Sequence, residues 1–239
     1  MSISTRSYAR PYTSGGLPRG IQALLIVNAA VFLIDFFTRG FFSFLALTPS
    51  EVVRSLHVWQ LATFLFLHGG LWNFLWNMLA LWWFGKELEE VWGTERFLRF
   101  YFLCGCGSGV CAVLAGYALG NPNAPIIGSS GAIYGILAAS AALWPDRMML
   151  FSFLFPMKMK YFVMLIGGID FLISYSVGAG QMALLTGLLF GLLYVKSPRV
   201  RGFDPMASLQ SGYRAWKLKR AKRKFQVYLR KHGSDRDVN

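Results

Sequence analysis

Gly128-Ser129-Ser130-Gly131-Ala132-Ile133-Tyr134-Gly135 begins an apolar run that ends at Trp144. The run from Ser130 to Trp144 has 15 residues, which is too few to cross a hydrocarbon core of about 30 Å at about 1.5 Å per residue. We therefore predict a helix that begins below the membrane surface, with Ser130 recessed among small residues that let another backbone approach closely. Ser130 is then a candidate nucleophile. The alternative is that it only caps and packs a membrane helix.

The sequence on both sides of this run is also apolar. Hydrophobic residues make up 55% of the 239 positions and charged residues 15%, whereas soluble domains carry about 25% charged residues. We predict an all-α membrane protein in which six helices cross the bilayer. The expected spans are Ile21–Phe37, Trp59–Phe84, Phe97–Leu119, Ser130–Trp144, a fifth with its core at Tyr161–Tyr175, and Met182–Val195.

Charge divides the chain into three predicted parts: a short polar tail at 1–20, the membrane domain at 21–195 and a basic tail at 196–239. With six spans both termini lie on one face, which would hold 22 of the 24 lysines and arginines and leave Arg39 and Arg54 on the other. Basic residues favour the cytoplasmic side. We therefore predict an integral, multi-pass protein with both termini in the cytoplasm, in a membrane of the bacterial plasma-membrane type.

The basic tail carries 13 of the 24 lysines and arginines, and between Tyr213 and Lys231 they alternate with aromatic and aliphatic residues. This pattern predicts a helix close to the anionic lipids of the inner leaflet. The alternative is a solvated segment that only anchors the topology. Because the basicity belongs to the tail, we expect the lipid bilayer and no nucleic acid as a partner.

Two pairs of glycines have the spacing that brings membrane helices together. Gly131 and Gly135 lie in the fourth expected helix, and Gly187 and Gly191 lie in the sixth. We predict that these two helices touch. Leu184 lies on the same helical stripe as Gly187, one turn earlier, and is therefore expected beside Ser130.

The second expected span contains several polar residues. Asn73 and Asn77 are four positions apart and share a helix face, so their amides could donate hydrogen bonds to a developing oxyanion or bridge two helices. His68 precedes the Gly69-Gly70 pair and is expected at the mouth of the helix as a structural residue.

The fifth expected span contains Asp170, and a carboxylate is costly inside a membrane. A structural hydrogen bond is favoured over a role as the acceptor of the Ser130 proton. The cysteines lie together in one apolar stretch and are interpreted as helix-packing residues, because their spacing predicts neither a disulfide framework nor a zinc site. They are Cys104, Cys106 and Cys111.

Seven short motifs follow one another along the chain in a characteristic order. They are Trp59-Gln60, Leu67–Trp72, Asn77–Trp82, Glu90–Gly93, Arg96-Phe97, Gly128–Gly135 and Gly187–Gly191. Together they resemble the rhomboid family of intramembrane serine proteases, and the similarity covers residues 20–195. No single fragment is specific, but their order, their spacing and the six-helix frame agree.

The resemblance implies that Ser130 is the catalytic nucleophile of a Gly-x-Ser-Gly motif formed with Gly128 and Gly131. Asn77 would be the oxyanion donor, assisted by the Ser130 N–H. Rhomboid proteases use a Ser-His dyad without metal or cofactor and cut transmembrane or juxtamembrane segments, so transmembrane proteins are the expected substrates or clients. The remaining positions that match family motifs are His68, Gly187 and Gly191.

Two positions depart from the family pattern. Leu184 stands where the family has its general-base histidine, and Asn73 stands where it has a second histidine. Leucine has no lone pair that could take the serine proton, and none of the remaining histidines fits this role: His57, His68 and His232.

We therefore expect a protease scaffold that is inactive or strongly impaired. The alternative is a non-catalytic, rhomboid-like pseudoprotease that binds or escorts membrane-protein segments. A channel or transporter is disfavoured because no series of intramembrane charges marks a pathway.

Overall fold

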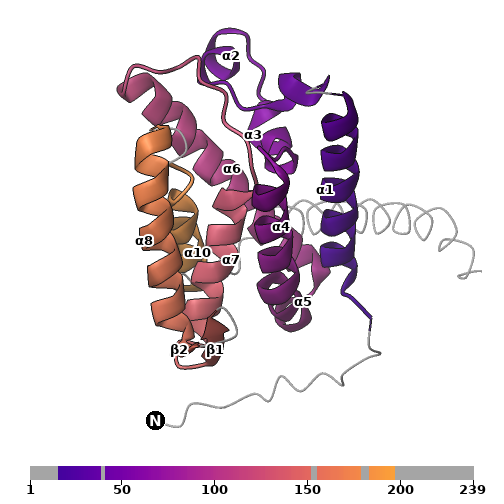
Figure 1. The fold of residues 1–239 in the computed structure, drawn as a ribbon, viewed down its shortest axis with the longest axis vertical. Coiled ribbons are helices and arrows are strands. Elements are labelled where there is room, and N and C mark those ends of the chain that lie inside the picture. The colour runs from indigo at the N-terminus through magenta and orange to yellow at the C-terminus, as the bar shows by residue number, and fades with distance from the viewer. Residues whose placement is uncertain (1–15, 39–40, 152–154, 179–182, 197–239) are drawn as a thin grey trace, which may run out of the picture. The chain divides into compact units, whose positions relative to one another are not determined.

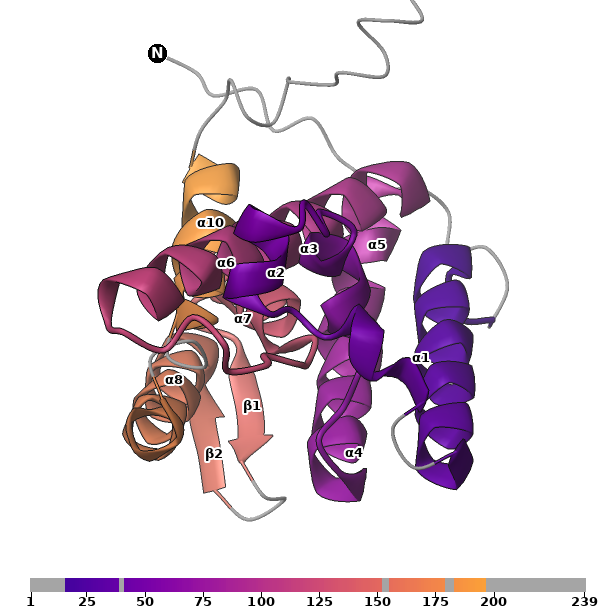
Figure 2. The same ribbon diagram turned by 90° about the horizontal axis from the view of Figure 1, so that it is seen from above.

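A computed structural model of the chain describes residues 16–38, 41–151, 155–178 and 183–196. Its main helices pack together at different tilts (Figure 2), with the short helix Pro49–Arg54 at one end of the bundle and a β-hairpin at the other (Figure 1). The elements are α1 (Arg19–Thr38), η1 (Phe41–Leu45), α2 (Pro49–Arg54), α3 (Gln60–Thr63), η2 (Phe64–Phe66), α4 (Leu71–Ala80), η3 (Leu81–Gly85), α5 (Lys86–Trp92), α6 (Thr94–Ala118), α7 (Ser130–Leu143), β1 (Met148–Phe151), β2 (Phe155–Lys158), α8 (Met159–Val177) and α10 (Thr186–Lys196).

Four of the expected spans coincide closely with helices, namely α1, α6, α7 and α8. The sixth begins later than expected, because α10 starts at Thr186 and Leu184 lies in the turn before it. Within the described ranges, α1 and α6 are each long and apolar enough to cross a membrane, and the bent pair Gln60–Phe66 and Leu71–Trp92 adds a third if it is one span. Six crossings remain a prediction. Most of the two predicted tails, 1–20 and 196–239, lies outside the described residues.

The second expected span, Trp59–Phe84, is not one continuous helix. The chain bends by 98° between Gln60–Phe66 and Leu71–Trp92, and the backbone is extended at Leu67 (φ −90°, ψ 144°). Gly69 and Gly70 occupy this break, and glycine is a poor helix former. The bend therefore follows from the glycine pair and places His68 between the helices, close to the expected helix mouth.

The described chain is mostly helical, and the connection between the fourth and fifth expected spans contains a short β-hairpin at Met148–Lys158 that was not expected from the sequence. There β1 and β2 form an antiparallel hairpin in which Met148 pairs with Lys158 and Met149 with Met157. Proline lacks the N–H that a helix interior requires, and Pro156 lies inside this segment. The base of the hairpin is closed by a hydrogen bond from the Met159 N–H to the Arg147 carbonyl, 2.8 Å from N to O.

Apolar side chains cover much of the outside of the helices. Several large ones are more than half exposed, including Phe37 on α1, Trp72 and Trp76 on α4, Leu114 on α6 and Met164 on α8. Soluble monomers rarely expose so much contiguous apolar surface. The distribution fits helices that face lipid.

The core is centred on α7, whose residues from Gly131 to Ser140 are all buried. A Cβ added to Gly135 would lie 2.5 Å from the Cys104 Sγ of α6, and one added to Gly191 of α10 would lie 2.5 Å from the Gly135 carbonyl oxygen. These glycines therefore permit α7 to pack closely against α6 and α10 together. The predicted contact between the fourth and sixth helices, and the packing role of Cys104, are confirmed.

A buried carboxylate joins the start of α1 to α5. The Gly20 and Ile21 N–H groups donate to Glu89, with N to O distances of 2.8 and 2.7 Å, and the Thr94 hydroxyl donates to the same carboxylate at 2.5 Å. The first N–H groups of a helix lack partners within the helix, and a negative charge there is favourable. Glu89 thus caps α1.

Candidate active site at the start of α7

The segment that leads into α7 is fixed by backbone hydrogen bonds to a distant part of the chain. Leu47 and Ile126 exchange two hydrogen bonds of 2.9 Å, and the Gly128 N–H donates to the Phe64 carbonyl at 3.0 Å. Gly128 has φ +117°, a conformation that side chains disfavour. The backbone turn two residues before Ser130 therefore requires a glycine at position 128.

Ser130 is the first residue of α7 and is half-buried. In Figure 1 the segment after α6 passes the end of the bundle near α2 and then descends before α7 begins, which agrees with a recessed helix start. A Cβ added to Gly128 would lie 3.6 Å from the Ser130 Oγ and 4.0 Å from the Asn73 Oδ1. The turn thus brings Ser130 and Asn73 to one side of Gly128.

Asn73 and Asn77 share a face of α4, as expected. The Asn77 Nδ2 donates to the Asn73 carbonyl at 2.9 Å and to the Asn73 Oδ1 at 3.3 Å. Asn77 is buried and Asn73 is exposed. In this structure the Asn77 amide therefore has partners within its own helix, and an oxyanion would compete with Asn73 for it.

Leu184 is buried, with 2% of its surface exposed, and its carbonyl oxygen would lie 3.5 Å from a Cβ added to Gly131. The contact arises because a Cβ added to Gly187 would lie 1.9 Å from the Gly131 carbonyl oxygen, so the two backbones touch. The backbone of Leu184 therefore lies next to Gly131, the residue after Ser130.

His68 contacts the neighbour of the candidate nucleophile. Its Nε2 lies 3.3 Å from the Ser129 Oγ, and its Nδ1 lies 3.3 Å from the Phe66 carbonyl oxygen. The edge of the ring meets the Phe74 ring, with centroids 5.4 Å apart. Sequence reasoning assigned His68 a structural place but missed the role of Ser129, because no local pattern connects residues 61 positions apart.

Asp170 has an interaction partner on α7. Its carboxylate interacts with the hydroxyl of Tyr134, which follows Ser130 by one helical turn. The expectation of a structural hydrogen bond agrees with this contact, which connects α8 to α7. The groups that could carry chemistry therefore come from α4, α7, the turn before α10 and, through Tyr134, α8.

A model of the Rhomboid domain matches residues 55–197, more than half of the chain. The chain belongs to the rhomboid family. Because this family is one of membrane proteins and the helices are apolar, the chain is an integral membrane protein.

Known rhomboid proteins from distant organisms are similar to this chain. It is 29% identical over 146 residues to the rhomboid protease GluP of Bacillus subtilis. This alignment covers 61% of this chain and 27% of that protein. It is 28% identical over 193 residues to the mitochondrial rhomboid protein 1 of Saccharomyces cerevisiae. That alignment covers 73% of this chain and 51% of the yeast protein. The chain thus spans at most about half the length of either relative.

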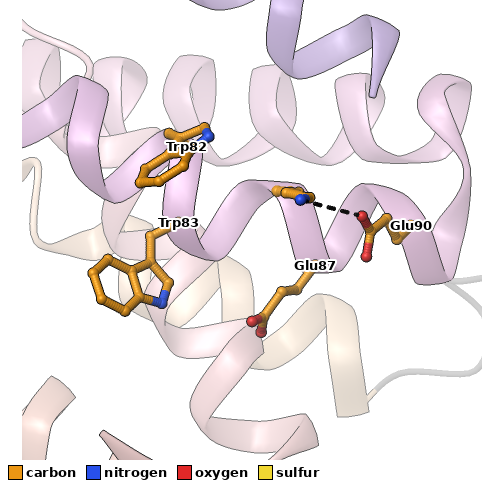
Figure 3. A pocket seen from close by; sticks show the side chains of 5 residues that line it. Trp82, Trp83, Glu87 and Glu90 are labelled. Atoms are coloured by element: carbon orange, nitrogen blue, oxygen red, sulfur yellow. Dashed lines mark ion pairs between the residues drawn. The ribbon is translucent and has the colours of Figure 1, made fainter. Parts of the chain in front are cut away.

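A pocket of about 270 Å³ lies elsewhere on this rhomboid scaffold, along η3 and α5. Its lining residues are Trp82, Trp83, Lys86, Glu87 and Glu90 (Figure 3). Lys86 pairs with Glu90, and Glu87 pairs with Arg147. Each of the three charged lining residues therefore takes part in an ion pair, two of them with each other and Glu87 with Arg147 outside the lining. The described residues contain no group of three or more metal-ligating side chains.

Proposed function

We propose that this rhomboid protein has the scaffold of an intramembrane serine endopeptidase with Ser130 as its nucleophile. We further propose that its proteolytic activity is absent or strongly impaired, because Leu184 occupies the position of the general base. The contact between Gly187 and Gly131 carries the proposal, since it holds the turn containing Leu184 against the residue that follows Ser130. The substrates or clients would be transmembrane or juxtamembrane segments of other proteins.

The arrangement suits attack by Ser130 on a peptide carbonyl. The developing oxyanion would accept hydrogen bonds from the Ser130 N–H at the start of α7, where helix N–H groups are free, and from the amides of Asn77 and Asn73. The hydroxyl proton would then need an acceptor, and leucine offers none. General bases contribute about 10²–10⁴-fold to enzymatic rates, so the reaction would stall at this step.

A second candidate function follows from the same position. Leu184 fills its site with a buried, apolar side chain, which favours packing over proton transfer. A non-catalytic protein would keep the fold and the recessed start of α7 and use them to bind or escort membrane segments. By analogy with the rhomboid family, we expect neither function to need a metal or cofactor.

Reaction with a fluorophosphonate probe would separate the two. We expect the unmodified chain in detergent to label very slowly, and Leu184→His to label and to cleave a transmembrane substrate about 10²–10⁴-fold faster. Leu185→His, one position away, is the matched control and should not gain activity. Ser130→Ala in the Leu184→His background should abolish labelling.

Rapid labelling of the unmodified chain that disappears in Ser130→Ala would contradict the missing base and exclude the pseudoprotease. Failure of Leu184→His to label, with the protein still folded, would contradict the protease scaffold.

A further inference from the structure

A buried serine–histidine pair, Ser129 and His68, lies next to Ser130. The Ser129 side chain is completely buried and His68 is 7% exposed, and the Ser129 Oγ lies 3.3 Å from the His68 Nε2. Because Ser129 is fully buried, it cannot meet a peptide substrate as a nucleophile. Its hydroxyl is directed into the protein, while the next residue, Ser130, is partly exposed.

The hydrogen-bond directions in this pair follow from its partners. The Phe66 carbonyl oxygen can only accept a hydrogen bond, so the His68 Nδ1, at 3.3 Å from it, carries the proton. The Nε2 of the neutral ring is then an acceptor, and the Ser129 hydroxyl donates to it. A directed chain results, from the Ser129 hydroxyl to His68 and from His68 to the Phe66 carbonyl. The Ser129 oxygen can still accept from the Tyr101 hydroxyl, which also interacts with it.

This chain holds the residue that fixes the start of α7. Ser129 precedes the helix, and its carbonyl accepts the first helical hydrogen bond, from the Ile133 N–H at 3.0 Å. The adjacent Gly128 N–H donates to the Phe64 carbonyl. The segment 64–68 therefore binds residues 128 and 129 through one backbone and one side-chain hydrogen bond. Both bonds are made by the two residues that directly precede Ser130.

We propose that His68, acting through Ser129, is a positioning residue for Ser130. The hydrogen bond would fix the peptide that carries the Ser130 N–H and Oγ, on the side of Gly128 where Asn73 lies. The proposal rests on the proposed function for the chemistry of Ser130, but the positioning itself is testable in the unmodified chain.

Hydrogen exchange of the amides of residues 128–133 tests the positioning without requiring activity. Ser129→Ala and His68→Phe should each accelerate exchange of these amides roughly fivefold or more, which corresponds to the loss of one typical hydrogen bond. The double variant should exchange no faster than either single one. His68→Gln keeps an acceptor near the Nε2 position and should restore part of the protection.

Ser140→Ala is the matched control, because Ser140 is also buried on α7 and its Oγ has no hydrogen-bond partner among the residues that the structure describes. It should leave exchange at 128–133 unchanged. The proposal is overturned if Ser129→Ala behaves like Ser140→Ala, or if the effects of His68→Phe and Ser129→Ala simply multiply.

The consequence for chemistry is measured in the Leu184→His background. There Ser129→Ala and His68→Phe should lower kcat at least tenfold and leave KM within about twofold, whereas Ser140→Ala should change neither. Unchanged kcat in both variants would overturn the proposal. If Leu184→His itself shows no activity, the proposed function fails, and the exchange rates alone decide whether His68 positions this turn.

Discussion

Gly187 lies where α10 touches α7 backbone to backbone, and its missing side chain is essential there. A Cβ at this position would meet the Gly131 carbonyl oxygen at 1.9 Å, an atom that cannot rotate away. We expect Gly187→Ala to push the helices apart and to lower the free energy of unfolding by about 1–3 kcal/mol. Thermal unfolding in detergent measures this. Gly168→Ala on α8 is the control, because a Cβ there would have no atom of the described part of the chain within 4 Å.

Glu89 is a second residue on which the packing depends. It accepts hydrogen bonds from two backbone N–H groups at the start of α1. Glu89→Gln replaces one acceptor oxygen by an NH₂ group, so one buried N–H loses its partner. We expect the free energy of unfolding to fall by about 1–3 kcal/mol, measured by the same unfolding assay. The exposed neighbour Glu90 provides the control Glu90→Gln, and equal effects of the two would contradict the cap.

At the scale of elements, the connection from α1 to α3 is organised around Gln60. This side chain is fully buried. Its Nε2 donates to the Glu51 carboxylate at 2.6 Å, and its Oε1 accepts from the Thr48 N–H at 3.0 Å. The His57 Nδ1 lies 3.3 Å from the same carboxylate. Gln60 therefore fastens α2 to the start of α3.

This network predicts an acid-sensitive connection. The hydrogen bond from Gln60, followed by that from His57, lowers the pKa of Glu51 below 4.5. A lowered folded-state pKa means that the carboxylate stabilises the connection above pH 4.5, and that this stabilisation is lost as pH falls through the folded-state pKa. We expect exchange of the α2 amides to accelerate below pH 4.5 more in the unmodified chain than in Glu51→Gln, after correction for intrinsic rates. Equal acceleration in both would contradict the assignment.

The helices were predictable where one apolar segment forms one element. Composition and length were sufficient for α1, α6, α7 and α8. The bend before α4 was missed because two glycines were treated as part of a long apolar segment, although the same pair correctly placed His68 near a helix mouth. The segment Met148–Lys158 was correctly left between two helices, but its pairing into a hairpin was not predicted, because its mixture of apolar and basic residues has no clear alternation.

At the scale of the whole molecule, the candidate site lies where segments distant in sequence meet. The contact of α10 with α7 was predictable, since two glycine pairs encode it, and with it the place of Leu184. The hydrogen bond between His68 and Ser129 was not predictable, because it depends on the bend before α4 and on the turn at Gly128 together. Local patterns specify helix faces, and pairing across the bundle needs the assembled fold.

The number of membrane crossings is the remaining whole-molecule property, and charge makes a definite prediction for it. If the chain crosses six times, residues 120–128 and the chain after Lys196 lie on opposite faces. Alkaline phosphatase fused after Pro122 should be active in the periplasm of a bacterial host, and the same enzyme fused after Lys196 should be inactive. Green fluorescent protein at these two positions should give the reverse pattern. Active phosphatase after Lys196 would place this end of the membrane domain on the periplasmic face, and the prediction that both termini are cytoplasmic would then be wrong.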